Sequence, residues 1–304
     1  MVERTFPIIN IDKGKNLFCW FVGGKIKMRK AYALITGASG GIGKELAELF
    51  AKDGHNLILV ARNEKKLIGV KKKLETRYGI RVVVIVLDLS KQNAAEKLHA
   101  YTTQKQYVVD HLVNNAGFGD WGEFLEADWE RQNEMVQVNL FALMRLTYLY
   151  GRDMKKQRKG CILNVASVAA FCAGPYMSVY YASKAFVLSF SQAIHEEAKE
   201  YGVSVTALCP GPTKTGFETA DVLGFVGISG IIVTAQLKNS KMFTLLPVES
   251  AKAVAKCGYK AMRKGQPLAY SGLVTKYGNV ASRIVSKRIA RKFAKQINGK
   301  PKRV

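Results

Sequence analysis

Tyr180 and Lys184 are the two residues of this sequence whose types and spacing most clearly suggest chemistry. They lie four residues apart, so in a helix both side chains project from the same face. A tyrosine in water has a pKa of about 10, and a neighbouring lysine ammonium favours the phenolate. Such a pair can exchange a proton with a carbonyl or an alcohol. Because a Tyr and a Lys at this spacing also recur by chance, the interpretation depends on the surrounding elements.

The composition describes an ordinary globular protein with an unusual charge. The chain has 304 residues, of which 48% are hydrophobic and 23% charged, which suits one large α/β domain or two small ones. The formal net charge is +24. This charge predicts an anionic partner, such as a phosphorylated cofactor, a coenzyme-A ester, a membrane surface or a nucleic acid.

The cysteines and histidines indicate neither disulfides nor a metal site. The five cysteines are odd in number and match no zinc spacing, which favours reduced thiols in a cytoplasmic protein. The four histidines are widely spaced in the sequence, so no metal is expected. These residues are Cys19, Cys161, Cys172, Cys209, Cys257, His55, His99, His111 and His195.

Short apolar runs alternate with longer amphipathic segments from residue 31 onwards. This alternation predicts an α/β fold with one doubly wound, Rossmann-like parallel sheet flanked by helices. The expected strands are 31–35, 56–61, 81–87, 109–113, 160–165, 203–208 and 267–270. The expected helices are 41–52, 64–78, 94–102, 128–156, 178–201 and 249–263.

Three parts of the chain are predicted: an extension (1–30), the Rossmann-like domain (31–272) and a basic C-terminal tail (273–304). The apolar run 17–22 is far shorter than the roughly 20 residues that a membrane span needs, and no signal-peptide pattern is present. The less regular stretch 213–247 leaves the carboxyl end of a strand, where ligands bind in such sheets. It is expected either to cover the substrate or to pack on the core as a peripheral helix.

An ordered set of motifs runs through the predicted domain. They are Thr36-Gly37-x-x-x-Gly41-x-Gly43, Asn114-Asn115-Ala116-Gly117, Asn139, Ser167, Tyr180-x-x-x-Lys184 and Pro210-Gly211. With these motifs in this order, residues 31–215 resemble the short-chain dehydrogenase/reductase family. The glycine turn alone is weak evidence, since its first two glycines are three residues apart rather than one.

The resemblance implies a dinucleotide cofactor at the carboxyl ends of the strands. Glycines in the first turn would let the backbone approach the pyrophosphate at a helix N-terminus, and Ser39 could bond a phosphate. Asp88 would contact the adenine, and Asn115 and Gly117 would line the adenosine side. The full expected set is Gly37, Ser39, Gly41, Ile42, Gly43, Arg62, Asp88, Asn115, Gly117, Tyr180, Lys184, Pro210, Gly211, Thr213 and Thr215.

The resemblance also implies the catalytic roles. Ser167 would donate a hydrogen bond to the substrate oxygen, and Tyr180 would be the general acid in reduction or the base in oxidation. Lys184 would lower the pKa of Tyr180 and hold the nicotinamide ribose. Asn139 would hold a water that relays protons to Lys184, or else simply bond to the helix backbone.

The residues that follow the second strand favour NADP over NAD. An acidic residue there would bind the ribose 2′-hydroxyl of NAD, but Arg62 stands there instead and would attract a 2′-phosphate. Glu64 is the contrary sign, and it is expected to point outward from the next helix. NADPH in turn favours reduction as the working direction.

The expected reaction interconverts a ketone and a secondary alcohol. Similarity to bacterial oxidoreductases and to 3-oxoacyl and hydroxysteroid reductases implies an apolar carbonyl, such as a 3-oxoacyl compound. The alternative is a non-catalytic dinucleotide-binding scaffold or sensor. A nucleic-acid partner is not expected, because the sequence carries no helix-turn-helix or zinc motif.

The tail has nine Lys or Arg residues after Ser282 and no acidic residue. Apolar residues recur among these charges at near-helical spacing from Val280 to Ile297, which predicts contact with an anionic membrane. A solvated or packed basic helix is the alternative. Since the motifs end by Thr215, the tail is expected to be dispensable for chemistry.

A homodimer or homotetramer is also expected. In the resembling family, the helices that bear Asn139 and Tyr180 commonly pack against their copies in a neighbouring subunit. The apolar residues available for such packing are Phe141, Leu143, Leu146, Phe186, Leu188 and Phe190.

Overall fold

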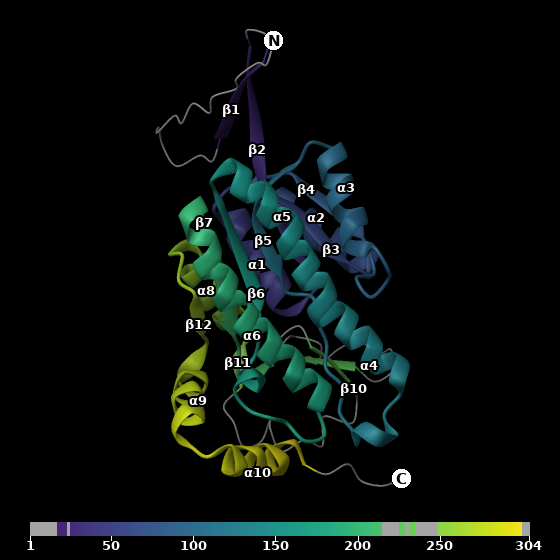
Figure 1. Ribbon diagram of the computed structural model, residues 1–304. Helices are drawn as coiled ribbons and strands as arrows, with labels where there is room; N and C mark the ends of the chain where they lie inside the picture. The colour runs from purple at the N-terminus through teal and green to yellow at the C-terminus, as the bar shows by residue number, and fades with distance from the viewer. Residues whose placement is uncertain (1–16, 23–24, 215–224, 229–230, 235–247, 300–304) are drawn as a thin grey trace.

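A parallel sheet of seven strands forms the centre of the protein (Figure 1). It is seen in a computed structural model that describes residues 17–22, 25–214, 225–228, 231–234 and 248–299. The strand order is β12 (Leu268–Tyr270), β7 (Val203–Cys209), β6 (Gly160–Val165), β5 (Val108–Asn114), β2 (Lys25–Thr36), β3 (Asn56–Ala61) and β4 (Val82–Val86). The chain order reverses between β2 and β5, which is where such sheets bind their ligands. The predicted fold class is confirmed.

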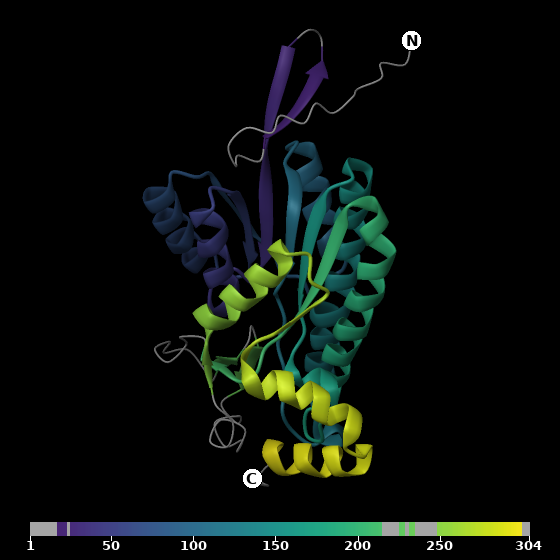
Figure 2. The same ribbon diagram turned by 90° about the vertical axis from the view of Figure 1, so that its left-hand side faces the viewer.

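Helices cover both faces of this sheet (Figures 1 and 2). One apolar core joins the sheet to α1 (Gly41–Lys52), α2 (Glu64–Tyr78) and α8 (Ala251–Arg263). The other core joins it to α3 (Ala94–Gln104), α5 (Leu143–Gln157) and α6 (Ser178–Ala198). Short helical turns lie at Phe124–Glu126, Val168–Phe171 and Lys199–Tyr201.

The predicted bounds hold for most elements, but the helix expected over 128–156 is not continuous. It is divided into α4 (Trp129–Val136), a π-helical turn (Gln137–Ala142) and α5. π-Turns insert an extra residue into a helix and are frequent at functional sites. Asn139 lies in this turn, so the departure from a regular helix falls on a predicted site residue.

The N-terminal extension contains structure that was not predicted. β2 begins at Lys25 rather than at residue 31, and its first part pairs antiparallel with β1 (Leu17–Val22). Figures 1 and 2 show this hairpin projecting beyond one end of the sheet, away from the C-terminal helices. β2 therefore runs continuously from the hairpin to the glycine turn.

The stretch after Pro212 contains strands where it is described. β8 (Thr213–Lys214) pairs in parallel with β11 (Glu249–Ser250), and β9 (Phe225–Ile228) forms a hairpin with β10 (Ile231–Thr234). The alternative of a peripheral helix does not hold for these residues. Whether the stretch covers a substrate depends on residues 215–224 and 235–247, which lie outside the described residues.

The basic tail forms two helices, α9 (Gly272–Ile284) and α10 (Lys287–Asn298). The single helical series expected from Val280 to Ile297 is thus interrupted after Ile284. Both helices lie beyond the carboxyl ends of the sheet strands (Figure 1). Among the described residues, none of the helices combines the length and the apolar character that crossing a bilayer requires.

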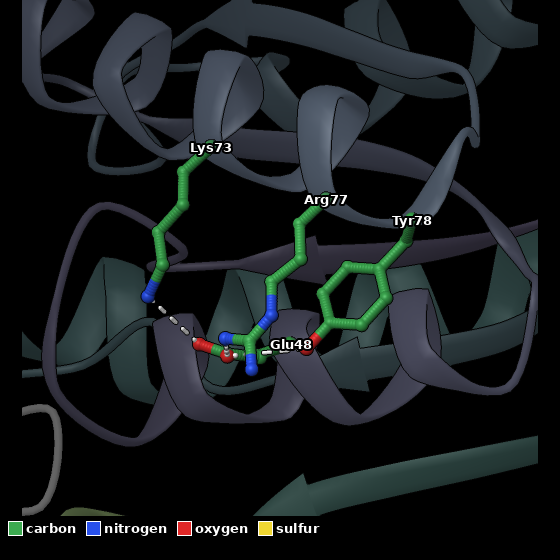
Figure 3. Close-up of polar contacts among 4 residues, drawn as sticks. All are labelled: Glu48, Lys73, Arg77 and Tyr78. Atoms are coloured by element: carbon green, nitrogen blue, oxygen red, sulfur yellow. Dashed lines mark hydrogen bonds and ion pairs between the residues drawn. The ribbon is translucent and has the colours of Figure 1, made fainter.

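A cluster of charges fixes the C-terminal half of α2 against that of α1 (Figure 3). Glu48 on α1 accepts bonds from Lys73 Nζ at 3.2 Å, Arg77 Nη1 at 2.8 Å and the Tyr78 hydroxyl at 3.2 Å. Burial alone would raise the pKa of Glu48, but these three partners outweigh it and lower the pKa. Glu48 therefore stays ionised and holds the two helices together.

Candidate active site

α6 carries Tyr180 and Lys184 side by side in the interior, as the spacing predicted. Both side chains are buried, and Lys184 Nζ lies 5.8 Å from the centre of the Tyr180 ring. Lys184 Nζ donates a hydrogen bond to the carbonyl oxygen of Val165 at 2.8 Å. Val165 ends β6, so the ammonium is fixed at the carboxyl edge of the sheet.

The pKa values of this pair differ from the expected pattern. Burial raises the pKa of Tyr180, Ser167 partly opposes this, and Lys184 is not among the groups that shift it. The lowering of the Tyr180 pKa by Lys184 stays a prediction. Burial lowers the pKa of Lys184 to about 8. Tyr180 is a protonated phenol at neutral pH, which is the form that a general acid requires.

The Tyr180 hydroxyl is buried without a hydrogen-bond partner among the described residues. Ser167 lies close enough to lower the pKa of Tyr180, but the two hydroxyls are not in hydrogen-bond geometry. Ser167 Oγ accepts a bond from Ala169 N at 3.1 Å, at the start of a short helical turn. An unpaired buried hydroxyl costs free energy, so its position points to a polar atom that another molecule supplies.

Asn139 bridges the π-turn, a neighbouring loop and α6. Its Oδ1 accepts from Phe118 N at 3.0 Å, and its Nδ2 donates to Phe118 O at 2.9 Å and to Ser183 Oγ at 3.0 Å. Ser183 Oγ in turn donates to the Tyr180 carbonyl oxygen at 2.7 Å. The second of the two interpretations of Asn139 predicted a bond to the backbone of its own helix. Asn139 does bond to backbone, but to that of a loop distant in the sequence.

Gly117 lies against these groups, where a side chain would collide with them. A Cβ atom at this position would lie 2.9 Å from Asn139 Oδ1 and 3.4 Å from Lys184 Nζ. The Gly117 backbone therefore runs close to the Asn139 amide and to the Lys184 amine. These donors and acceptors suit the hydroxyls of the cofactor ribose that the motifs imply.

The glycine turn is clamped to the strand beside it at the point where the strand order reverses. Asn115 Nδ2 donates to Thr36 O at 3.0 Å and to Gly37 O at 3.2 Å. Thr36 Oγ1 accepts from the backbone N–H groups of Asn115 and Ala116, both at 3.0 Å. Gly37 has φ +65°, and a Cβ there would lie 2.7 Å from Asn115 Nδ2, so no other residue fits. Asn115 thus shapes the turn directly.

The N-terminus of α1 suits an anion. Neither a side-chain cap nor an acidic residue occupies its first turn, so its N–H groups face the glycine turn uncompensated. Gly41 begins the helix and Ser39 is half-buried in the turn. Ile42, expected among the cofactor residues, has its side chain fully in the apolar core.

Arg62 and Asp88 follow neighbouring strands at the same edge. Arg62 is exposed after β3, and Glu64 is exposed in the first turn of α2, as predicted. Burial alone would raise the pKa of Asp88, but hydrogen bonds from Ser90 and the charges of Arg62 and Lys91 outweigh it and lower the pKa. Arg62 and Asp88 are therefore close enough to interact.

The segment after β7 completes the same edge. Pro210 and Gly211 are buried, and the Pro210 carbonyl accepts from Val168 N at 2.8 Å, next to Ser167. Thr213 is buried and donates through Oγ1 to Gly211 O at 2.8 Å. Thr215 lies outside the described residues.

Two polar residues of this site were missed as functional by the sequence analysis. Thr36 and Ser183 both lie inside the quoted motifs, but their roles depend on bonds to residues far away in the chain. A second buried chain of bonds joins two strands and two helices through Asn114, Thr147, Asn164 and Ser191. The sequence could have indicated Thr36 and Ser183 only through their position next to residues of the quoted motifs.

Two of the four histidines are not dispersed in space. The rings of His55 and His111 lie 4.8 Å apart, and Asp110 joins them as a group whose ligand atoms all lie within 4.8 Å of one another. His111 Nδ1 lies 2.7 Å from Asp110 Oδ1, and Arg263 Nη1 lies 3.3 Å from His111 Nε2. The guanidinium already supplies the positive charge that a metal ion would bring. We interpret the group as a buried ion pair that stabilises the fold.

Comparison with known proteins agrees with this arrangement. The family model described as "short chain dehydrogenase" matches residues 31–222. Diacetyl reductase [(S)-acetoin forming] of Staphylococcus epidermidis is 34% identical over 184 residues, covering 60% of this chain and 71% of that protein. Very-long-chain 3-oxoacyl-CoA reductase of Rattus norvegicus is 31% identical over 194 residues, covering 62% and 61%.

A solved structure shows the same fold with a nucleotide bound. The short-chain dehydrogenase from Sphingobium yanoikuyae in complex with NADPH superimposes with a TM-score of 0.70 at 27% identity. The alignment covers 84% of this chain and 93% of that chain.

Proposed function

This chain belongs to the short-chain dehydrogenase family, and we propose that it reduces an apolar ketone to a secondary alcohol with NADPH. The relatives named above are reductases, which supports oxidoreduction between a carbonyl and an alcohol with a nicotinamide cofactor. The substrate, the choice of NADPH and the direction of the reaction are the parts that we propose. A non-catalytic scaffold would not need the enclosed Tyr180, Lys184 and Ser167.

The observation that carries the proposal is the Tyr180 hydroxyl, which is buried and has no hydrogen-bond partner in the described part of the chain. When bound between Lys184 and the glycine turn, the cofactor would supply a hydride to the carbonyl carbon. Tyr180 donates its proton to the carbonyl oxygen, so that an alcohol is formed. Ser167 donates a hydrogen bond to the same oxygen as negative charge develops there.

Lys184 and Asn139 support this proton transfer. With its pKa near 8, Lys184 can exchange a proton at neutral pH, and its position beside Gly117 suits a ribose hydroxyl. Asn139 holds the Phe118 backbone and Ser183, which fixes the carbonyl end of Tyr180. We assign Asn139 to positioning, together with the water that the resemblance implies.

NADPH is preferred in this proposal because Arg62 lies exposed where the 2′-phosphate would be. The preference is supported by the absence of an acidic residue at that position. Asp88, whose carboxylate already accepts two bonds from Ser90, is left for the adenine. Both residues follow adjacent strands, as cofactor contacts do in this fold.

An apolar substrate suits the surroundings of Tyr180. The cluster around its ring is made of apolar and aromatic side chains, including Phe118, Trp121 and Met177. The relatives named above act on diacetyl and on very-long-chain 3-oxoacyl-CoA. A 3-oxoacyl compound or another lipophilic ketone is the class we propose.

The test is a panel of ketones in which NADPH consumption is followed by its absorbance. Small diketones, steroid ketones and 3-oxoacyl thioesters should be compared at equal concentration, with NADH in place of NADPH as the second arm. We expect apolar ketones to be reduced fastest and with NADPH. Turnover of none of them by a folded, NADPH-binding protein would contradict the proposal.

The proposal also covers the oligomeric state, the location and the membrane contact of the protein. Phe141 is exposed, and the rings of Phe186 and Phe190 stack 5.5 Å apart at half-buried positions of α6. These apolar side chains support a homodimer or homotetramer. Light scattering measures this state. The free thiols of Cys161, Cys172, Cys209 and Cys257 suit a cytoplasmic location. We also propose that the protein contacts an anionic membrane peripherally.

A further inference from the structure

The C-terminal helix α10 is bound to the wall beside Tyr180 through one buried residue, Asn298. Its backbone oxygen accepts from Trp121 Nε1 at 2.9 Å, and its Oδ1 accepts from the Tyr181 hydroxyl at 3.1 Å. Its Nδ2 donates to Pro175 O at 2.8 Å. Asn298 is fully buried, so these three bonds form without competition from water.

Apolar contacts reinforce this attachment. Ala294 and Ile297 are buried on the same side of α10 as Asn298. Ala294 belongs to the cluster that also contains the rings of Tyr180 and Tyr181. The tail is therefore a packed helix next to the catalytic phenol, which argues against the expectation that it is dispensable for chemistry.

The outward side of the two C-terminal helices is both apolar and basic. On α10, Ile289 and Phe293 lie one turn apart and are 59% and 60% exposed. On α9, the exposed apolar residues are Tyr277, Val280 and Ile284. The exposed cations of α10 are Lys287, Arg288, Arg291, Lys292 and Lys295.

An anionic lipid surface satisfies both properties of this face. The stretch from Ser271 to Val304 contains no acidic residue, so its positive charge is not neutralised within the stretch itself. Lipid phosphates provide the opposite charge, and the headgroup boundary accepts exposed apolar side chains. A second copy of this chain fits less well, because it would bring the same cations against each other.

We propose that α9 and α10 bind the protein to an anionic lipid surface. We also propose that Asn298 attaches α10 to the residues that surround the substrate beside Tyr180. The ketone then enters from the lipid. Asn298 is a positioning residue, acting through Tyr181 and Trp121 on the pocket around Tyr180. The inference rests on the proposed reductase function for its substrate, but not for its lipid contact.

The lipid contact is tested by co-sedimentation of the full chain with vesicles of phosphatidylglycerol or of phosphatidylcholine. We expect binding to the former only. The Arg288→Gln/Lys292→Gln variant should bind roughly 25-fold more weakly, about fivefold for each charge removed. The matched control, Lys65→Gln/Lys72→Gln, changes two exposed lysines of α2 and should bind normally. No sedimentation of the wild type at low salt would overturn the proposal.

The entry route is tested by presenting ketones in two forms. The Ile289→Ser/Phe293→Ser variant should reduce a small water-soluble ketone at the wild-type rate. It should reduce a long-chain ketone dissolved in phosphatidylglycerol vesicles about 10-fold more slowly or worse. Equal rates with the vesicle-borne ketone would overturn entry from the lipid. If the wild type reduces neither ketone, the proposed function fails, while sedimentation still decides the lipid contact.

The role of Asn298 is tested with the soluble ketone and with a matched control. Asn298→Ala should lower kcat/KM about 10-fold, and Tyr181→Phe should do the same, because each removes the same hydrogen bond. The double variant should be no worse than either alone. Asn279→Ala removes the bond from Asn279 on α9 to the Tyr270 hydroxyl on β12, and it should leave kcat/KM unchanged.

A purely structural role for Asn298 would give a different result. Asn298→Asp keeps the acceptor for Tyr181 and should recover most of kcat/KM, even where its melting temperature matches that of Asn298→Ala. Additive losses in the double variant, or equal activity of the Asn298→Ala and Asn279→Ala proteins, would overturn the assignment.

Discussion

Buried ionisable groups occur in two regions of this sheet, and their partners differ. Within the strands, Asp110 and His111 form a contact at 2.7 Å with Arg263 beside it. At the carboxyl edge, the Tyr180 hydroxyl has no partner among the described residues and Lys184 donates only to a neutral carbonyl. In the first region, the charge of Asp110 is opposed by neighbouring bases of the protein. In the second region, the partners of Tyr180 and Lys184 are expected to come from bound molecules. This difference distinguishes a stabilising cluster from a reacting one.

The pKa shifts follow the same division. Burial would lower the pKa of His111, but Asp110 and Cys161 outweigh it and raise the pKa. For Tyr180 and Lys184, burial is the largest influence and nothing reverses it. His55 resembles the second region in this respect, since burial and His111 lower its pKa to about 4.

Tyr180→Phe should produce the largest effect. It should abolish most of the activity without lowering the free energy of unfolding. Loss of the proton donor should reduce kcat by about 10²–10⁴-fold. The free energy of unfolding should be unchanged or higher, because an unpaired buried hydroxyl is removed. Stopped-flow kinetics and urea unfolding measure the two quantities. Retention of most of the rate would mean that another group donates the proton.

Asp110→Ala should show the opposite behaviour. Leaving the buried His111 without its carboxylate should cost about 3–5 kcal/mol in the free energy of unfolding. The activity of the molecules that remain folded should be normal. The control is Asp153→Ala, which breaks a partly exposed pair with His99 and should cost about 1 kcal/mol or less. Urea titrations compare the two variants.

Lys184→Met should remove a pH dependence of stability. Between pH 8 and 10.5 the unfolded lysine binds a proton and the folded one does not, so stability rises with pH across this window. The rise due to Lys184 amounts to about 3 kcal/mol. Urea midpoints at several pH values should show it in the wild type and in an exposed-lysine control, Lys264→Met. An identical slope in the Lys184→Met protein would show that Lys184 is charged throughout.

Arg62→Ala should give the smallest of these effects. Charge-assisted bonds to a phosphate contribute about 1.5–3 kcal/mol, so NADPH should bind roughly 10- to 100-fold more weakly. Affinity for NADH should be unchanged, because it lacks the 2′-phosphate. Calorimetry with both cofactors provides the comparison. Equal losses for the two would remove the argument for NADPH.

Local patterns predicted the fold well because they recur within each element. The helix over 41–52 and the strand over 56–61 have the predicted bounds, since glycine turns and apolar runs mark their ends. The motif spacing likewise predicted that Tyr180 and Lys184 share a face. These features depend on residues within a few positions of one another.

Features that depend on distant contacts were not predictable. The proximity of His55 to His111 arises from the pairing of strands, and neither position carries a local signal of it. The π-turn at Asn139 accompanies bonds to Phe118, twenty-one residues away. The raised pKa of Tyr180 depends on how many segments enclose it, which spacing along one helix does not reveal.

Asn298 also has a consequence for biosynthesis. Its bonds to Trp121 and Tyr181 span 177 and 117 residues of chain. Contacts of such separation close late, because the intervening chain must first be ordered. During translation, the sheet and its catalytic tyrosine can fold while residue 298 is still inside the ribosome. The pocket is therefore complete only after residue 298 has left the ribosome, and a nascent chain with a complete sheet is still catalytically immature.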